Sequence, residues 1–83
     1  MTEKKLIALG FEKQIEDDVA DPFYYYTLDI TSGLSFITQA NDEVKNGEWI
    51  VEIFNASEIK FTNPKTLSTL IEILNNNKDE ITK

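Results

Sequence analysis

Residues 21–30 read DPFYYYTLDI, and this stretch decides how the chain can fold. Its aromatic and β-branched residues predict a strand over 23–30, which Pro22 starts in an extended conformation. Successive side chains of a strand point to opposite faces, so a single core cannot bury all the rings. The strand therefore has one apolar face and one mixed face. The apolar face carries Tyr24, Tyr26, Leu28 and Ile30, and the mixed face carries Phe23, Tyr25, Thr27 and Asp29.

Three further strands are predicted around this one. In residues 11–16 the apolar side chains of Phe11 and Ile15 share one face. Residues 34–40 follow a Thr-Ser-Gly turn and return as the antiparallel neighbour. Residues 48–54, EWIVEIF, have the strongest strand pattern in the chain. Residues 59–61 are either a short extension of the sheet or an edge piece.

The connection over residues 41–47 leaves two interpretations open. Asn46 and Gly47 form the dipeptide most typical of a tight hairpin turn. The polar residues before them suit a longer loop equally well.

A helix is predicted at each end of the chain. Thr2 is a suitable N-cap for a helix over residues 3–9, which Gly10 ends. Asn63 and Pro64 predict the start of a helix that continues to Asn76, because proline is favoured at the first helical position. The residues after it, Lys78–Lys83, are expected to be a frayed tail. The second helix has one apolar stripe, made of Leu67, Leu70, Ile71 and Leu74.

These elements predict an α+β fold in a single domain, residues 1–83. A four-stranded antiparallel β-meander carries the short N-terminal helix and the longer C-terminal helix on one face. Tyr24 and Tyr26 are expected in the core beneath the Leu67–Leu74 stripe. The other strands are expected to add Leu34, Phe36, Thr38, Ala40, Trp49, Val51 and Ile53 to the core face.

The opposite face of this sheet is the candidate binding surface. Exposed patches that mix aromatic and acidic side chains are typical of protein-binding sites. Alternatively, a helix, the tail or a second copy of the chain covers this face. The residues expected to contact a partner are Phe23, Tyr25, Asp29, Glu48, Ile50, Glu52 and Phe54, with Ile37 on the same face.

Composition excludes several classes of function. The 83 residues include no Cys and no His, and all eight basic residues are Lys. Disulfides and thiolate metal sites are therefore excluded, and the usual general base is missing. The net charge of −7 argues against binding to nucleic acid or to an anionic membrane. No apolar run reaches the ~20 residues that a membrane span requires. We expect a cytoplasmic protein without a cofactor.

Paired carboxylates are the only catalytic chemistry that this composition leaves open. Asp29, Glu48 and Glu52 share the mixed face, but a bare sheet offers little concavity for a substrate. The acidic and amide residues of 41–48 lack the spacing of a twelve-residue calcium loop. We therefore expect no enzymatic activity and no metal site.

Three segments, LIALGFEK at 6–13, PFYYYTLDI at 22–30 and EWIVEIFN at 48–55, precede the Leu-rich helix with its Asn-Pro cap. Together they resemble a group of short uncharacterised proteins encoded by bacteria and their phages. The resemblance implies a small cytosolic protein of phage or mobile-element origin, and it assigns no functional residue.

The leading hypothesis is a small acidic, non-enzymatic protein-interaction module, such as a phage accessory or inhibitor protein. Its partner would be a protein of unknown identity. The first alternative is an acidic decoy that imitates nucleic acid through residues 12–21, where Glu12, Glu16, Asp17, Asp18 and Asp21 cluster. The second alternative is a structural domain that forms homo-oligomers, including a homodimer.

Overall fold

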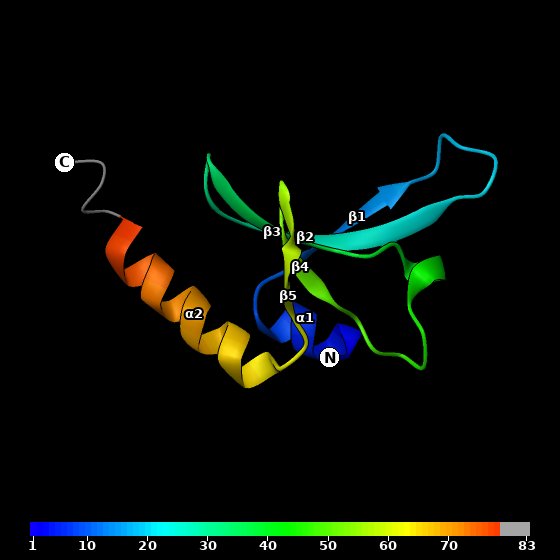
Figure 1. The fold of residues 1–83 in the computed structure, drawn as a ribbon. Helices are drawn as coiled ribbons and strands as arrows, with labels where there is room; N and C mark the ends of the chain where they lie inside the picture. The colour runs from blue at the N-terminus through cyan, green and yellow to red at the C-terminus, as the bar shows by residue number, and fades with distance from the viewer. Residues whose placement is uncertain (79–83) are drawn as a thin grey trace.

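The computed structural model describes residues 1–78, which form a short helix, a five-stranded antiparallel sheet and a longer helix (Figure 1). The α+β class and the helix at each end of the sheet are confirmed, but the sheet has five strands and not four. No helix within residues 1–78 is long and apolar enough to cross a membrane. In chain order the elements are α1 (Glu3–Ala8), β1 (Glu12–Glu16), β2 (Phe23–Thr31), β3 (Leu34–Thr38), the 3₁₀ helix η1 (Asn41–Glu43), β4 (Val51–Ile53), β5 (Ala56–Phe61) and α2 (Pro64–Asn77).

Both helices begin as predicted. The Thr2 hydroxyl accepts a hydrogen bond from the Lys5 N–H at 3.2 Å, and Gly10 has a φ of 100° just after α1. The Asn63 side chain accepts from the Lys65 N–H at 2.8 Å, with Pro64 in the first turn of α2. Lys78 caps the C-terminus of α2, and the rest of the predicted tail, 79–83, lies outside the described residues.

The fifth strand results from a turn that was not predicted from the sequence. The predicted strand over 48–54 is reduced to β4. At its start, Glu48 pairs with Lys45 and the Trp49 backbone bonds to Met1; at its end, the chain turns at Phe54 and Asn55 and returns as β5. Asn55 has a φ of 70°, a left-handed conformation that asparagine adopts more readily than most residues. The predicted piece at 59–61 is therefore the end of a six-residue strand.

The connection between β3 and β4 combines both of the open interpretations. It is long and contains η1, and it also contains a tight turn at Asn46 and Gly47, whose φ values are 58° and 70°. Two positive φ values in a row are characteristic of a type I′ hairpin turn. An isolated bridge between Lys45 and Glu48 closes this turn.

The ladder between β2 and β3 ends early because side chains replace it. The Thr38 hydroxyl accepts a hydrogen bond from the Tyr26 N–H at 3.0 Å, and the Asn41 side chain accepts from the Tyr24 N–H at 2.8 Å. As a result, β3 ends at Thr38 and not at the predicted Ala40. The first residues of β2 keep only β1 as a strand neighbour.

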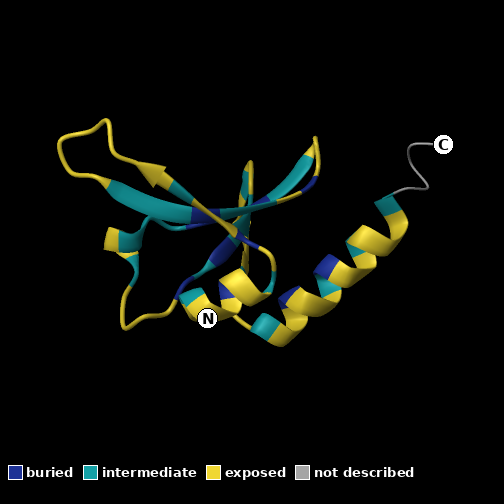
Figure 2. Cartoon of the chain, turned by 180° about the vertical axis from the view of Figure 1, so that it is seen from behind, coloured by how far each residue is buried: buried dark blue, intermediate teal, exposed yellow. Residues whose placement is uncertain are grey.

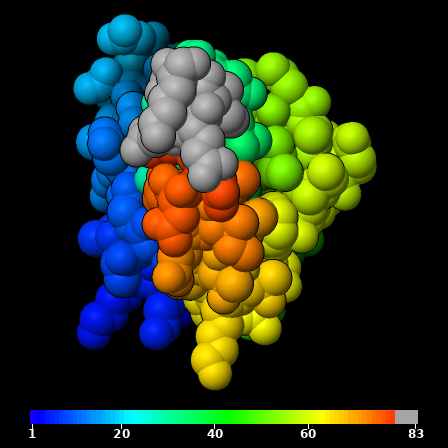
Figure 3. Space-filling view, turned by 90° about the vertical axis from the view of Figure 1, so that its left-hand side faces the viewer, coloured from blue at the N-terminus to red at the C-terminus, as the bar shows by residue number. Residues whose placement is uncertain are grey.

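Both helices lie on the same side of the sheet (Figures 1 and 2). In Figure 3, α2 crosses in front of the strands, between the N-terminal part of the chain and the β4–β5 hairpin. The predicted stripe of α2 is confirmed, since Leu67 and Ile71 are buried while Leu70 and Leu74 pack against the core. The largest fully buried side chains are Phe36, Leu6, Leu67 and Val51.

Tyr24 and Tyr26 lie on the core face, as expected, and their rings contact each other and Trp49. The ring centroids of Tyr26 and Trp49 are 5.3 Å apart, and those of Tyr24 and Trp49 are 5.9 Å apart. The Tyr26 hydroxyl donates a hydrogen bond of 2.7 Å to the Glu3 carboxylate on α1. Burial, together with this acceptor, raises the pKa of Tyr26 to about 12.

We predict that Thr38→Val lowers the free energy of unfolding by about 1–3 kcal/mol. The substitution keeps the volume of the side chain but leaves the buried Tyr26 N–H without an acceptor. The measurement is urea denaturation of the variant beside Thr38→Ser, which keeps the hydroxyl. If Thr38→Val and Thr38→Ser lower the free energy of unfolding equally, the hydrogen bond from the Tyr26 N–H to the hydroxyl does not contribute to stability.

We also predict that stability falls as the pH rises from about 10 to 12. The neutral Tyr26 phenol is favoured in the folded state, so its contribution is complete below the unfolded pKa and is lost as the pH passes the folded pKa. Unfolding followed by circular dichroism across this range should show a shallower decline for Tyr26→Phe. Parallel declines in the two proteins would contradict the prediction.

Candidate functional site

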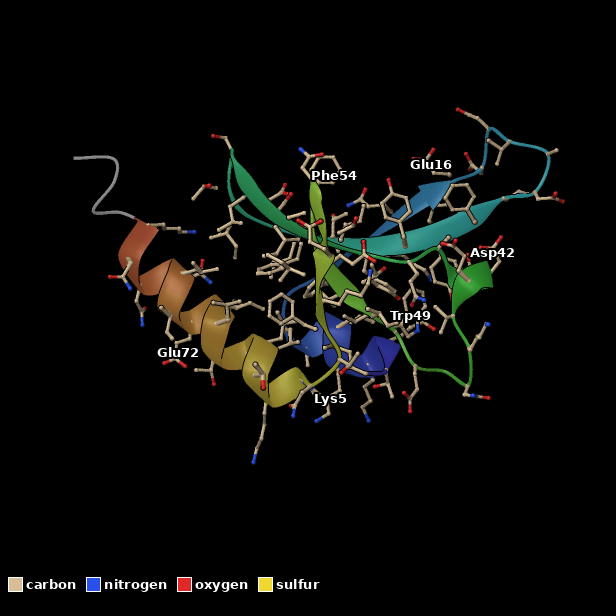
Figure 4. All side chains as sticks on the ribbon, viewed as in Figure 1. Lys5, Glu16, Asp42, Trp49, Phe54 and Glu72 are labelled. Atoms are coloured by element: carbon tan, nitrogen blue, oxygen red, sulfur yellow. The ribbon has the colours of Figure 1, made fainter. Side chains whose placement is uncertain are left out.

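The sheet face turned away from α1 and α2, here called the far face, carries five of the seven residues predicted to contact a partner. Register and alternation place side chains from every strand on it. In Figure 4, Glu16 and Phe54 both lie on this side of the sheet, well separated from each other. The far-face residues are Glu12, Gln14 and Glu16 of β1, Phe23, Tyr25, Thr27 and Asp29 of β2, Ser35 and Ile37 of β3, Glu52 of β4 and Lys60 of β5, with Phe54 at the turn after β4.

Phe23 and Tyr25 form a pair of stacked rings at one end of the far face. Their centroids are 6.2 Å apart with an interplanar angle of 30°, and both side chains are half-buried. The Tyr25 hydroxyl donates a long hydrogen bond of 3.4 Å to the carboxylate of Glu16, on the paired strand β1. The rings therefore contact each other and Glu16, and they leave part of their surface open to solvent. We call Phe23 and Tyr25 the ring pair.

An ion pair joins β4 to the edge strand β5 on the far face. The Lys60 ammonium lies 2.7 Å from the Glu52 carboxylate and also donates to the Ser57 carbonyl at 2.8 Å. Ile37 is directly opposite Glu52 in the register. Lys60 therefore offsets part of the negative charge that Glu52 contributes to this face.

Asp29 and Phe54 lie at the other end of the far face, on either side of Ser35. Asp29 pairs with Ser35, and the Phe54 N–H donates to the Ser35 carbonyl at 3.0 Å. The Phe54 side chain is 55% exposed. Phe23 and Asp29 are six residues apart along β2, which corresponds to about 20 Å. The ring pair and Phe54, which lies near Asp29, therefore do not form one aromatic patch.

Glu48 and Ile50 do not lie in a strand, contrary to the prediction. Glu48 closes the turn with Lys45, and the Ile50 N–H donates to the Gln39 side chain at 3.1 Å. Both line an open hollow of about 450 Å³ beside Trp49. The predicted surface is thus divided into four parts: the ring pair, the Glu52–Lys60 ion pair, the group around Phe54, and this hollow.

The predicted acidic cluster lies on the β1–β2 hairpin. All of its members, Glu12, Glu16, Asp17, Asp18 and Asp21, are exposed. Along β1, Glu12 and Glu16 are separated by about 13 Å. A DNA strand places a phosphate every ~3.4 Å along the helix axis, about four over the same length. The charge density on this strand is therefore lower than that of the polymer it would imitate.

Among the described residues, no group of three or more acidic side chains is arranged to hold a metal ion. Every buried side-chain nitrogen or oxygen in the same part of the chain has a hydrogen-bond partner. Within residues 1–78, therefore, no buried side chain has an unpartnered polar atom that would indicate a bound ligand.

Glu16 and Lys60 lie on the far face but were not predicted from the sequence. Alternation along 12–16 places Glu16 on the same face as the ring pair, so this signal was readable. The pairing of Lys60 with Glu52 was not, because the β4–β5 register shifts between Glu52 and Ile53.

A scan against protein-family models and searches of curated proteins and solved structures found no match to this chain. The resemblance to short phage proteins stays a prediction.

We predict that a double-mutant cycle on Phe23→Ala and Tyr25→Ala gives a coupling of about 0.5–1.5 kcal/mol in the free energy of unfolding. Either substitution removes the stacking contact, so the double variant should lose less stability than the sum of the two single variants. The matched control is the cycle on Tyr25→Ala and Phe54→Ala, whose residues lie at opposite ends of the face and should be additive. Equal coupling in both cycles would contradict this description of the far face.

Proposed function

We propose that this protein is a small, non-enzymatic interaction module that binds another protein through the ring-pair end of its far face. The observation that carries the proposal is the stacked pair of Phe23 and Tyr25 beside the Glu16 carboxylate, on a sheet face that neither helix covers. The resemblance to phage-encoded proteins favours an accessory or inhibitor role in the cytoplasm.

The geometry supports binding because much of the ordering is complete before a partner arrives. Tyrosine and phenylalanine supply large contact areas and have few rotatable bonds. Stacking further restricts both rings, which reduces the entropy that a partner must remove. Tyrosine is one of the residue types enriched among those that dominate binding energies.

The proposal is narrower than the sequence-based hypothesis. It retains Phe23 and Tyr25 as anchors and adds Glu16, which supplies a carboxylate within hydrogen-bond distance of Tyr25. Asp29 and Phe54 become a separate and more distant group, and Glu48 and Ile50 belong to the hollow beside Trp49.

The test is affinity capture from host lysate with immobilised protein, read by quantitative mass spectrometry. We predict that Phe23→Ala with Tyr25→Ala reduces recovery of the specific partner by about tenfold or more. The control variant is Ile73→Ala, which removes an apolar side chain that is 53% exposed on the outer side of α2.

Ile73→Ala should recover the same partner as the unmodified protein. If the ring-pair variant also recovers it in full, the ring pair is not the binding surface. If only Phe54→Ala loses the partner, binding occurs at the other end of the far face, and the proposal is wrong as stated.

A further inference from the structure

The hydrogen bonds of β2 determine which backbone groups of β1 are free. The N–H groups of Tyr24 and Tyr26 point toward β3, because they donate to the side chains of Asn41 and Thr38. Backbone groups alternate in direction along a strand, so Tyr25 and its alternate neighbours in β2 point toward β1.

The residues of β1 that bond to β2 are those paired with these neighbours, such as Gln14 opposite Tyr25. By the same alternation, the N–H and C=O groups of Lys13 and Ile15 point to the open side of β1. The N–H of Phe11, two residues earlier, also points away from β2 and donates to the Leu6 carbonyl at 3.0 Å. Lys13 and Ile15 therefore form an edge where another strand can add.

β1 and β5 are the two edge strands of the sheet, and only β1 has a regular edge. The register of β1 with β2 runs without a shift over five residue pairs. The register of β5 with β4 is interrupted between Glu52 and Ile53. Irregularity of this kind protects an edge from pairing with another chain. No described element covers the outer side of β1 (Figure 1), and most of the strand is exposed (Figure 2).

The side chains of β1 differ between its two faces. Glu12 and Glu16 are exposed on the far face, with Gln14 between them. On the opposite face, the Lys13 ammonium lies 4.1 Å from the centre of the Tyr24 ring, and Ile15 is 64% exposed. A complementary strand would carry basic residues on the far face and an apolar residue beside Ile15.

A second copy of this chain does not meet that requirement. Antiparallel pairing that uses the whole of β1 in both copies is centred on Gln14 and places Glu12 opposite Glu16 at each end. Like charges directly opposite each other destabilise a strand pair. The net charge of −7 on each copy adds further repulsion.

We propose that the open edge of β1 binds an extended segment of a partner protein in which basic and apolar residues alternate. The segment adds as an antiparallel sixth strand that bonds to the backbone of Lys13 and Ile15. Its basic side chains lie on the far face beside Glu12 and Glu16, next to the ring pair. The inference rests on the proposed function, because it names the kind of partner that the same end of the sheet accepts.

The probe is a blocked peptide of alternating lysine and valine, about seven residues long so that it spans β1. Binding to the full chain is measured by isothermal titration calorimetry. Ile15→Pro removes an N–H that faces the open edge, a position at which edge strands tolerate proline. We predict a loss of affinity of about tenfold or more for Ile15→Pro, and about threefold or less for Ile15→Ala, which keeps the N–H.

A second pair of peptides tests the same contact without changing the protein. Methylation of the valine amides, which face β1 in the antiparallel arrangement, should abolish binding. Methylation of the lysine amides, which face solvent, should leave the affinity within about twofold. These peptides decide the matter even if Ile15→Pro does not fold.

The charge requirement is tested with Glu12→Gln and Glu16→Gln together. This variant should bind the peptide about tenfold more weakly, and its affinity should depend less on salt. A peptide with glutamate in place of lysine should not bind to the unmodified protein.

The outcomes separate this inference from the proposed function. If Tyr25→Ala abolishes peptide binding while Ile15→Pro and valine methylation do not, the ring pair binds the peptide and the edge inference is overturned. If Ile15→Pro abolishes binding while Tyr25→Ala does not, the edge inference stands without the ring pair. Absence of binding to the unmodified protein, or equal binding of the glutamate peptide, overturns the inference.

Discussion

The packing of Trp49 against Tyr24 and Tyr26 is the contact on which the arrangement of the sheet depends. Trp49 precedes β4 and is separated from both tyrosines by the long connection after β3, so the β2–β3 ladder alone does not bring them together. The backbone of Trp49 also exchanges two hydrogen bonds with Met1, at 2.7 and 3.1 Å, and Tyr26 binds Glu3. One cluster thus joins the N-terminal helix, the first strand pair and the start of β4.

This cluster also determines which side chains of β2 point to the far face. A strand whose even-numbered rings are fixed in the core must turn Phe23 and Tyr25 outward, because a slip of one residue would exchange the two sets completely. The exposure of the ring pair is therefore a structural consequence of burying Tyr24 and Tyr26. The side chains of Thr38 and Asn41 have a related effect, since they satisfy the N–H groups of β2 where β3 has left the sheet. The end of β2 that carries the ring pair thereby remains a two-stranded ribbon with an open edge.

Sequence alone predicted the features that depend on local chemistry. The caps at Thr2 and Asn63, the stripe of α2 and the two faces of β2 all follow from residues within a few positions of one another. The fifth strand was missed, because the turn at Phe54 and Asn55 lacks a glycine and interrupts a run that reads as one strand.

The candidate surface was predicted less completely than the fold, because it depends on pairing between distant segments. Phe23 and Tyr25 were assigned correctly to the far face, since alternation within β2 is sufficient. Glu48 and Ile50 were assigned to a strand that does not extend that far. The contact of Lys60 with Glu52 depends on an irregular register, which no spacing in the sequence reveals.

The distribution of charge links the far face to the edge of the sheet. Glu52, on β4, is paired with Lys60, whereas no cation is paired with the exposed Glu12 of β1 among the described residues. Uncompensated carboxylates along a regular edge strand oppose pairing with an identical edge, which is a common protection against aggregation. In the complex that we propose, the same charges favour a strand of opposite sign, so the feature that opposes pairing of two β1 edges also favours the basic partner strand. Both effects, the repulsion between two β1 edges and the attraction of a basic strand, come from the same carboxylates of Glu12 and Glu16.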